Sequence, residues 1–227
     1  MKMYIISILT MVTINNLQSQ EDAKLIYIGD PMCSWCYGIA PEWQKIKTQY
    51  QGKLEIEYVM GGLRPYYEKP MSEMKDFLTD HWKHVYEASN QPFNYEILNR
   101  SDLNYDTEPP SRAVVVIQSL NPNAVGSFFA EVQSLFYYDN KNMNESKSYH
   151  TLLEKYNVNT DEFDKLFNSD EMRQATKTGF NKAKSLGVAS FPTVLLMMGE
   201  EQYIVTQGYS TSNKMNQVID NLLSKAH

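Results

Sequence analysis

The chain begins with two short apolar segments that have the pattern of β-strands, joined by a segment with helical spacing. Residues 24–29 form an apolar run that stops at Asp30-Pro31, which predicts a buried strand followed by a turn. Residues 54–60 alternate between apolar residues and glutamates, as a half-buried strand does. Apolar residues recur at helical spacing over 33–50, although Pro41 predicts a kink or an early break there. Together these segments predict a β–α–β unit.

A long stretch with helical periodicity follows, over residues 65–186. One break is expected near Asn168-Ser169, where Ser169 is a suitable N-cap for a following helix. The predicted helices cover residues 74–86, 110–120, 125–139, 149–156 and 160–186.

Strand patterns return near the C-terminus. Residues 193–198 are strongly apolar, and a turn at 199–201 leads to a second strand at 203–208, so the two are predicted to form a hairpin. Residues 211–226 have the apolar stripe of an amphipathic helix. We therefore predict an α/β protein with one domain split between residues 24–64 and 187–227, and a helical domain inserted at residues 65–186.

The first twenty residues have the order of a signal peptide. A basic start at Lys2 precedes a short apolar core, and a polar segment with Ser19 at a plausible cleavage point follows. This predicts a periplasmic or secreted protein with a signal peptide over residues 1–20; the alternative is an N-terminal extension of a cytoplasmic protein. The apolar stretch is too short to span a bilayer, so no stable membrane insertion is expected.

Composition and charge narrow the class of protein. The formal net charge is −6, and the lysines and arginines are scattered, without the basic stripe that nucleic-acid binding requires. Nucleic acid is therefore not expected as a partner. The chain has only two cysteines, Cys33 and Cys36, which excludes a small fold held together by several disulfides.

The two cysteines form a Cys-x-x-Cys motif at the predicted strand-to-helix turn. Unpaired backbone N–H groups at a helix start favour a thiolate, which is the nucleophile in disulfide exchange. The second cysteine lies one helical turn further on and is expected to be more covered. We therefore predict a redox pair in which Cys33 attacks and Cys36 resolves the mixed disulfide.

Two other interpretations of this pair remain open. Cys-x-x-Cys is also a common zinc half-site, and His81 and His84 are spaced to supply two further ligands from one helical face. Such a site belongs to a zinc-stabilised, non-catalytic binding module. The third interpretation is a buried, inert pair of cysteines.

Phe191-Pro192-Thr193 is the second segment that points to redox chemistry. A proline directly before an apolar strand, beyond a long insertion, is consistent with a cis X–Pro bond. Such a bond presents the backbone of Phe191 to an extended substrate beside the active sulfur. The alternative is a trans proline that only begins a strand.

Several segments together resemble the DsbA family, and more narrowly its branch described as predicted protein-disulfide isomerase and related to FrnE. They are Asp30–Gly38, Gly61–Pro65, Tyr105–Pro109, Ser111–Val115 and Phe191–Thr193, and the resemblance covers residues 24–227.

The resemblance implies a thioredoxin fold interrupted by an inserted α-helical domain. It also implies a thiol–disulfide oxidoreductase or isomerase that acts on thiol- or disulfide-containing proteins, is recycled by a redox partner and holds no cofactor. By position, Cys33, Cys36 and Pro192 carry over as catalytic residues. Substrate binding is expected at Phe191, Trp35 and Ser34.

The sequence departs from the family pattern at Tyr27. Many relatives hold a buried acid at this position, which accepts the proton of the resolving thiol; here Glu57 on the next strand, or a water, is the suggested substitute. The Ser34-Trp35 dipeptide is also unusual, so the direction of electron flow is left open.

A second enzyme class shares the split fold. Kappa-type glutathione-dependent transferases or isomerases work through a serine or a single thiol with glutathione, and the intact pair of Cys33 and Cys36 argues against them. Asp106, Glu108 and Arg112 at a predicted helix start have two interpretations: a polar rim that selects substrate, or an N-cap with a surface ion pair.

Overall fold

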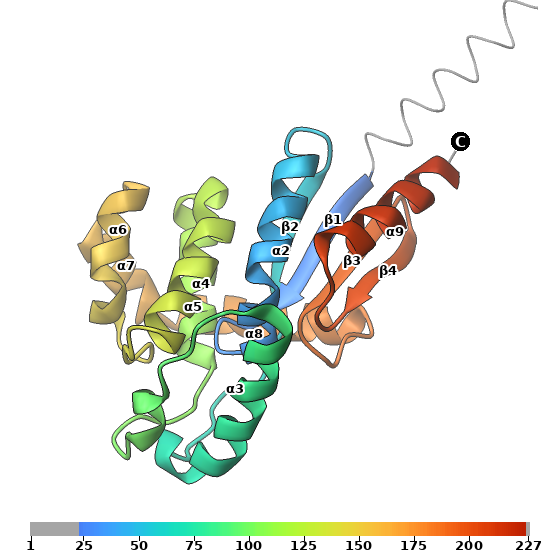
Figure 1. The fold of residues 1–227 in the computed structure, drawn as a ribbon. Helices are drawn as coiled ribbons and strands as arrows, with labels where there is room; N and C mark the ends of the chain where they lie inside the picture. Colours follow the sequence, from blue (N-terminus) through green and yellow to red (C-terminus); the bar gives the residue numbers. More distant parts are fainter. Residues whose placement is uncertain (1–22, 226–227) are drawn as a thin grey trace, which may run out of the picture.

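Over residues 23–225, which the computed structural model describes, the strands form one four-stranded sheet in the order β2–β1–β3–β4 (Figure 1). β1 (Ala23–Gly29) pairs in parallel with β2 (Glu55–Met60) and antiparallel with β3 (Thr193–Met198). β3 pairs antiparallel with β4 (Glu201–Gln207), which confirms the predicted hairpin. The predicted signal peptide lies outside the described residues.

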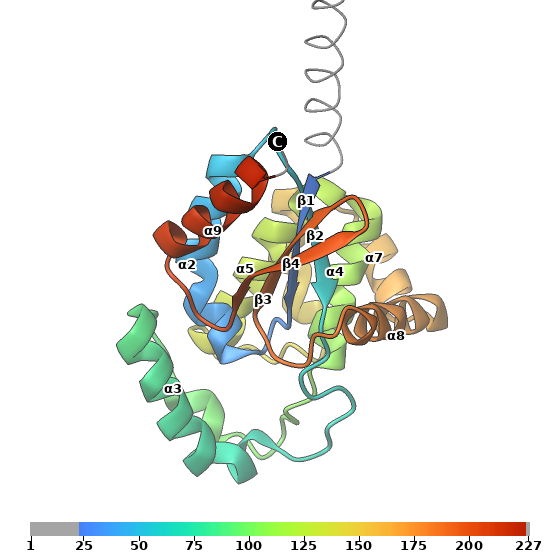
Figure 2. The same ribbon diagram turned by 90° about the vertical axis from the view of Figure 1, so that its right-hand side faces the viewer.

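Both faces of the central strand β1 are covered. Leu25 and Tyr27 pack into the larger hydrophobic core, on the side of helix α2 (Ser34–Tyr50), whereas Ile26 and Ile28 pack against Ala183 and its neighbours on the other side. Figure 2 shows α2 and α9 (Ser212–Lys225) on one side of the sheet and α8 (Asp170–Ser185) on the other. This burial on two sides explains why the strand is continuously apolar rather than alternating.

Helix α2 continues past Pro41, so the early break does not occur. A proline at this position cannot donate a backbone hydrogen bond to Tyr37. The side chain of Gln91 donates to the Tyr37 carbonyl instead, at 3.0 Å. The freed carbonyl therefore has a partner, and the helix runs on to Tyr50.

The helices between β2 and β3 follow the predicted order. Residues 160–186 break where expected, and the Ser169 hydroxyl accepts a hydrogen bond from the Met172 N–H at 3.2 Å, which caps α8. Besides α8, the helices are α3 (Lys75–Ser89), α4 (Glu108–Leu120), α5 (Val125–Tyr137), α6 (His150–Leu153) and α7 (Thr160–Phe167), with short 3-10 turns at 71–74, 95–99, 122–124, 146–149 and 154–156.

Helix α3 projects from the body of the molecule in Figure 2 and is held by an aromatic cluster. The Trp82 side chain has no exposed surface and lies 5.1 Å from both Phe93 and Tyr137, measured between ring centroids. Because Tyr137 belongs to α5, this cluster joins α3 to the rest of the helices.

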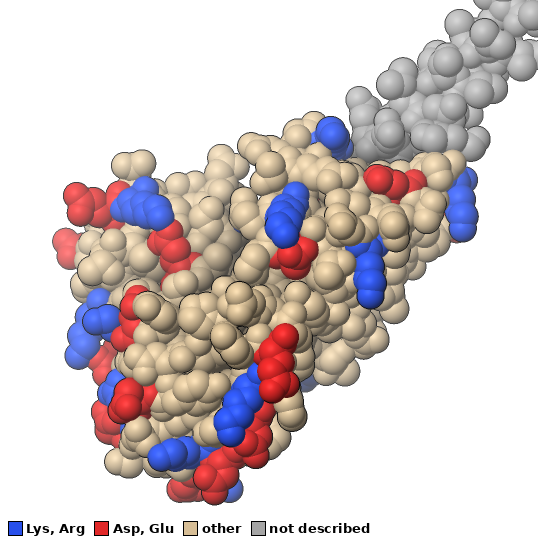
Figure 3. Space-filling view, in the orientation of Figure 1, with Lys and Arg blue, Asp and Glu red and all other residues tan. Residues whose placement is uncertain are grey.

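Charged side chains of both signs are interspersed over the face in Figure 3, which agrees with the scattered lysines and arginines of the sequence. Within the described chain, none of the helices has the length and apolar character needed to cross a bilayer.

Candidate active site

The turn between β1 and α2 is organised by the buried carboxylate of Asp30. One carboxylate oxygen accepts the Met32 N–H at 2.9 Å, and the other accepts the Leu63 N–H at 2.7 Å. The Asp30 carbonyl accepts the N–H of Cys33 at 3.0 Å. Burial raises the pKa of Asp30 to about 6, although the two backbone donors oppose the shift. Asp30 thus fixes the turn that delivers Cys33 to the helix start.

Segments far away in the sequence meet at this turn. The Thr107 hydroxyl accepts the Arg64 N–H at 3.0 Å, and Thr107 also opposes the rise in the pKa of Asp30. The Tyr105 hydroxyl donates to the Met32 carbonyl at 2.8 Å. The motif segments at 61–65 and 105–109, which the sequence singled out only by family resemblance, therefore support the backbone before Cys33.

The ionisation of Asp30 gives a testable pH dependence. Its pKa is raised from 3.8 to about 6 in the folded protein, so the folded state holds this proton more tightly than the unfolded chain does. Asp30 therefore contributes stability that is present below pH 3.8 and is lost as the pH rises through 6, by up to about 3 kcal/mol. Urea unfolding at several pH values is expected to show this loss in the wild-type protein.

The matched variant is Asp30→Asn, which keeps the side-chain shape and cannot ionise. The difference in unfolding free energy between the two proteins isolates Asp30 from the other carboxyl groups. That difference is expected to shift in favour of the variant between pH 4 and pH 6, and a constant difference over this range contradicts the prediction.

Cys33 is the N-cap residue of α2, and Cys36 lies in the first turn of the helix. The Cys33 side chain donates to the carbonyl of Phe191 at 3.5 Å. Cys33 is 5% exposed and Cys36 is fully buried, so Cys36 is the more covered of the two, as the sequence predicted. Cys33 is itself more sheltered than a helix start alone suggests, because the segment at Phe191 covers it.

The Phe191–Pro192 peptide bond is cis, as predicted. The Pro192 carbonyl accepts the Gly208 N–H at 2.7 Å, which ties this segment to the end of β4. The Phe191 ring packs against Gly61, where a Cβ atom would approach the ring to 2.1 Å. A glycine at position 61 therefore gives the ring its place beside the cysteines.

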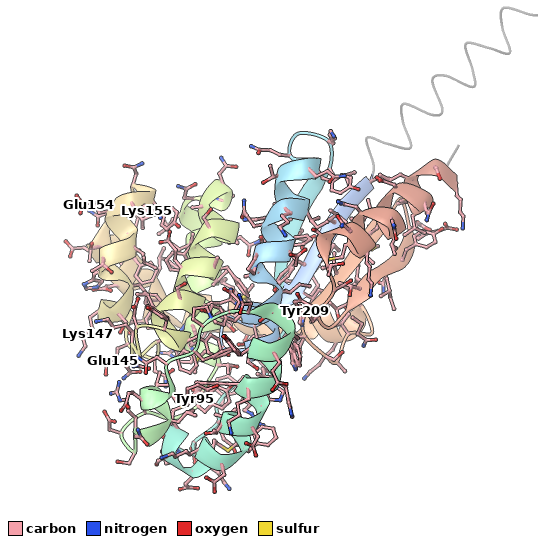
Figure 4. All side chains as sticks on the ribbon, viewed as in Figure 1. Tyr95, Glu145, Lys147, Glu154, Lys155 and Tyr209 are labelled. Atoms are coloured by element: carbon pink, nitrogen blue, oxygen red, sulfur yellow. The ribbon has the colours of Figure 1, made fainter. Side chains whose placement is uncertain are left out.

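An aromatic rim borders the cysteines. The ring of Trp35 is half-buried and lies 6.0 Å from His81 and 6.3 Å from Tyr209, between ring centroids. Figure 4 shows Tyr209 where the segment after β4 approaches α3. The Phe77 ring stacks on His81, with 5.7 Å between the ring centroids. Ser34, next to Trp35, is buried and does not belong to this rim. Sequence reasoning did not include Phe77 or Tyr209, because only the fold brings α3 and the β4–α9 connection to Trp35.

The suggested role of Glu57 as proton acceptor for Cys36 is wrong. Glu57 pairs in register with Ile26, so it lies on the face of the sheet that is opposite α2. Its carboxylate forms ion pairs with Lys24, at 2.9 Å, and with Lys182 of α8. Partial burial opposes ionisation, but these two lysines outweigh it and lower the pKa of Glu57.

The interpretation of Glu108 and Arg112 as a surface ion pair also needs correction. Both side chains are buried, with Arg112 Nη2 3.3 Å from Glu108 Oε2, and the Arg112 guanidinium lies 4.4 Å from the Phe167 ring centroid. Helix α7, which carries Phe167, covers the pair. Asp106 accepts the backbone N–H groups of Tyr66 and Glu108 and so supports the start of α4.

Of the two histidines proposed as zinc ligands, one lies beside Trp35 and the other is exposed to solvent. Burial, with a smaller contribution from His84, lowers the pKa of His81, which faces the Trp35 ring; His84 is exposed. Among residues 23–225, no group of three or more His, Cys, Asp or Glu side chains is arranged to hold a metal ion.

The chain is similar to known proteins both in sequence and in fold. A family model described as thioredoxin matches residues 26–217. The fold is similar to that of a candidate protein disulfide isomerase from Nitrosomonas europaea, with a TM-score of 0.82 and 31% identity over 90% of this chain and 98% of that one. No curated protein sequence matches the chain.

Two more distant structures share the fold. The cytosolic disulfide reductase DsbM from Pseudomonas aeruginosa has a TM-score of 0.72 and 20% identity, over 89% of this chain and 99% of that one. The oxidoreductase DsbA from Xylella fastidiosa has a TM-score of 0.59 and 12% identity, over 91% and 87%. The predicted fold class, a thioredoxin fold interrupted by helices, is thereby confirmed.

Proposed function

This chain belongs to the thioredoxin family, and on that premise we propose that it is a DsbA-like oxidoreductase that exchanges disulfides with protein substrates through Cys33 and Cys36. The observation that carries the proposal is the contact between Cys33 Sγ and the Phe191 carbonyl, 3.5 Å apart. It brings the first thiol of the Cys-x-x-Cys pair to the segment before Pro192, so two separate motifs form one site.

The location of Cys33 suits it to make the first attack. It stands at the start of α2, a helix of 17 residues, and its sulfur contacts the Phe191 carbonyl. The proposed nucleophile is therefore the Cys33 thiolate, and Cys36, one turn further on, is the resolving thiol.

The exchange proceeds in two steps. The Cys33 thiolate attacks a substrate disulfide; a bond forms between Cys33 and one substrate sulfur, and the other leaves as a thiolate that takes up a proton. Deprotonated Cys36 then attacks Cys33 Sγ, which forms the Cys33–Cys36 disulfide and releases the second substrate sulfur. Two electrons thus pass to the substrate, and the same steps in reverse oxidise a substrate dithiol.

The aromatic rim gives the substrate its place in this proposal. Trp35 and Phe191 border Cys33 from opposite halves of the chain, and an extended peptide is proposed to lie between them with its cysteine against Cys33. The buried Ser34 is proposed to shape the turn beneath the substrate.

A redox titration tests the proposed function. The purified protein is equilibrated with buffers of reduced and oxidised glutathione at pH 7, and Trp35 fluorescence is followed. Because Trp35 lies between the two cysteines in sequence, its emission is expected to change in one reversible transition that fits two electrons. The midpoint gives the reduction potential and hence the favoured direction of exchange.

The control is Cys33→Ser, in which no internal disulfide can form. This variant is expected to lose the two-electron transition. If the wild-type protein also lacks it and instead carries one stably bound glutathione, the single-thiol chemistry of the kappa-type enzymes replaces the proposed function.

A further inference from the structure

The phenol of Tyr27 lies against the resolving cysteine. Tyr27 is a buried residue of the central strand β1, and its ring and Cys36 Sγ converge on Gly29. A Cβ atom on Gly29 would lie 2.6 Å from Tyr27 Cε1 and 3.1 Å from Cys36 Sγ. The phenol ring of Tyr27 therefore lies beside the Cys36 sulfur. The absence of a side chain at Gly29 therefore lets phenol and thiol meet.

Cys36 has to lose a proton in a dry environment before it can resolve a mixed disulfide. Burial and the neighbouring Cys33 raise the pKa of Cys36, whereas the Asp30 backbone N–H and the Tyr27 phenol lower it. Burial and the nearby thiols also raise the pKa of Tyr27, so the phenol is neutral at pH 7 and can donate a hydrogen bond to a Cys36 thiolate.

Other titratable groups near this pair are less suited to take the proton. The carboxylate of Asp30 already accepts the Met32 and Leu63 N–H groups, the Tyr58 hydroxyl on β2 accepts the Trp43 Nε1–H, and the Tyr137 ring on α5 is stacked on Tyr37.

A cavity of about 210 Å³ lies behind Tyr27, between α2 and α5. It has room for several water molecules, at about 30 Å³ each. Gln133 lines it and is fully buried, and neither atom of its amide group has a hydrogen-bond partner within residues 23–225. Lys47 and the exposed Gln44 line both this cavity and a larger surface hollow beside β2. The Tyr27 cavity therefore carries the Gln133 amide on its wall and shares Lys47 and Gln44 with the surface hollow.

We propose that Tyr27 is the proton relay of Cys36, passing the thiol proton to water in the Tyr27 cavity. This rests on the proposed function. As Cys36 attacks Cys33 Sγ, its proton moves to the Tyr27 oxygen while the phenolic proton moves to a cavity water, so Tyr27 stays neutral. The Cys33–Cys36 bond forms, the bond between Cys33 and the substrate sulfur breaks, and the released thiolate takes up a proton from solvent. Electrons and protons balance without a further reactant.

Tyr27→Phe tests the relay, because it removes one hydroxyl and keeps the ring that fills the core. Reduced protein is mixed with oxidised glutathione, and the release of the first and second glutathione is followed separately between pH 6 and pH 9. The second release, which reports on Cys36, is expected to slow about ten- to hundredfold at pH 7. The pH at which the second release speeds up is also expected to be higher in Tyr27→Phe than in the wild type. The rate of the first release is expected to be unchanged.

Tyr58→Phe is the matched control. Tyr58 is paired with Tyr27 in the sheet, its ring centroid lies 5.3 Å from that of Tyr27, and its hydroxyl accepts the Trp43 Nε1–H. This variant is expected to keep the wild-type rates. If Tyr27→Phe releases the second glutathione at the wild-type rate and with the wild-type pH profile, the relay is overturned but the proposed function is left intact. No second release in the wild-type protein overturns the proposed function itself.

Discussion

Changing Cys36 to Ala is expected to leave the protein covalently joined to its substrates through Cys33, whereas changing Cys33 to Ala is expected to reduce exchange to the uncatalysed rate. Cys33 stands at the helix start and contacts Phe191, but Cys36 has no exposed surface and reaches only Cys33 and the groups behind it. Without Cys36 the first attack still occurs, and the mixed disulfide has no internal thiol to break it.

The measurement is a non-reducing gel of each variant after incubation with a disulfide-containing protein, followed by mass spectrometry of the joined species. Ser34→Ala serves as the control, because it changes a buried residue between the cysteines and keeps both thiols. It is expected to turn over without trapping substrate. Equal trapping by Cys33→Ala and Cys36→Ala contradicts the assignment of the two roles.

Trp82→Ala is expected to cause the largest loss of stability, about 3–5 kcal/mol. The Trp82 ring is fully buried against Phe93 and Tyr137, and its removal leaves a cavity between α3 and α5. Such a loss is a large part of the 5–15 kcal/mol that is typical of a folded domain. Urea unfolding followed by circular dichroism measures it.

Phe77→Ala is the control on the same helix. Phe77 is 57% exposed, so its removal is expected to change the unfolding free energy by no more than about 0.5 kcal/mol. If Trp82→Ala costs as little as Phe77→Ala, contacts other than the aromatic cluster attach α3 to the molecule.

The strands, the order of elements and the position of Cys33 at a helix start were predictable because their signals are local. The short apolar run over residues 24–29 is typical of a buried strand, and the turn at Asp30-Pro31 places Cys33 at a helix start. Ser169 likewise signals the start of α8 through its own side chain.

The rest of the site depends on contacts between residues that are distant in the sequence. The alternation in β2 separates Glu57 from Tyr58, but only the register with β1 shows that Tyr58 faces Tyr27 while Glu57 faces α8. The burial of Arg112 depends on Phe167, more than fifty residues later, so its helix alone suggested a surface position.

The separation of 158 residues between Cys33 and Phe191 has a consequence for the growing polypeptide. At about 5–20 residues per second, Cys33 is made about 8–30 seconds before Phe191. During that interval β1 lacks β3, one of its two neighbours in the sheet, and the thiol lacks the segment that later shelters it. The nascent chain therefore carries an unprotected cysteine pair before it is an enzyme, and at this stage it is itself a substrate for disulfide chemistry.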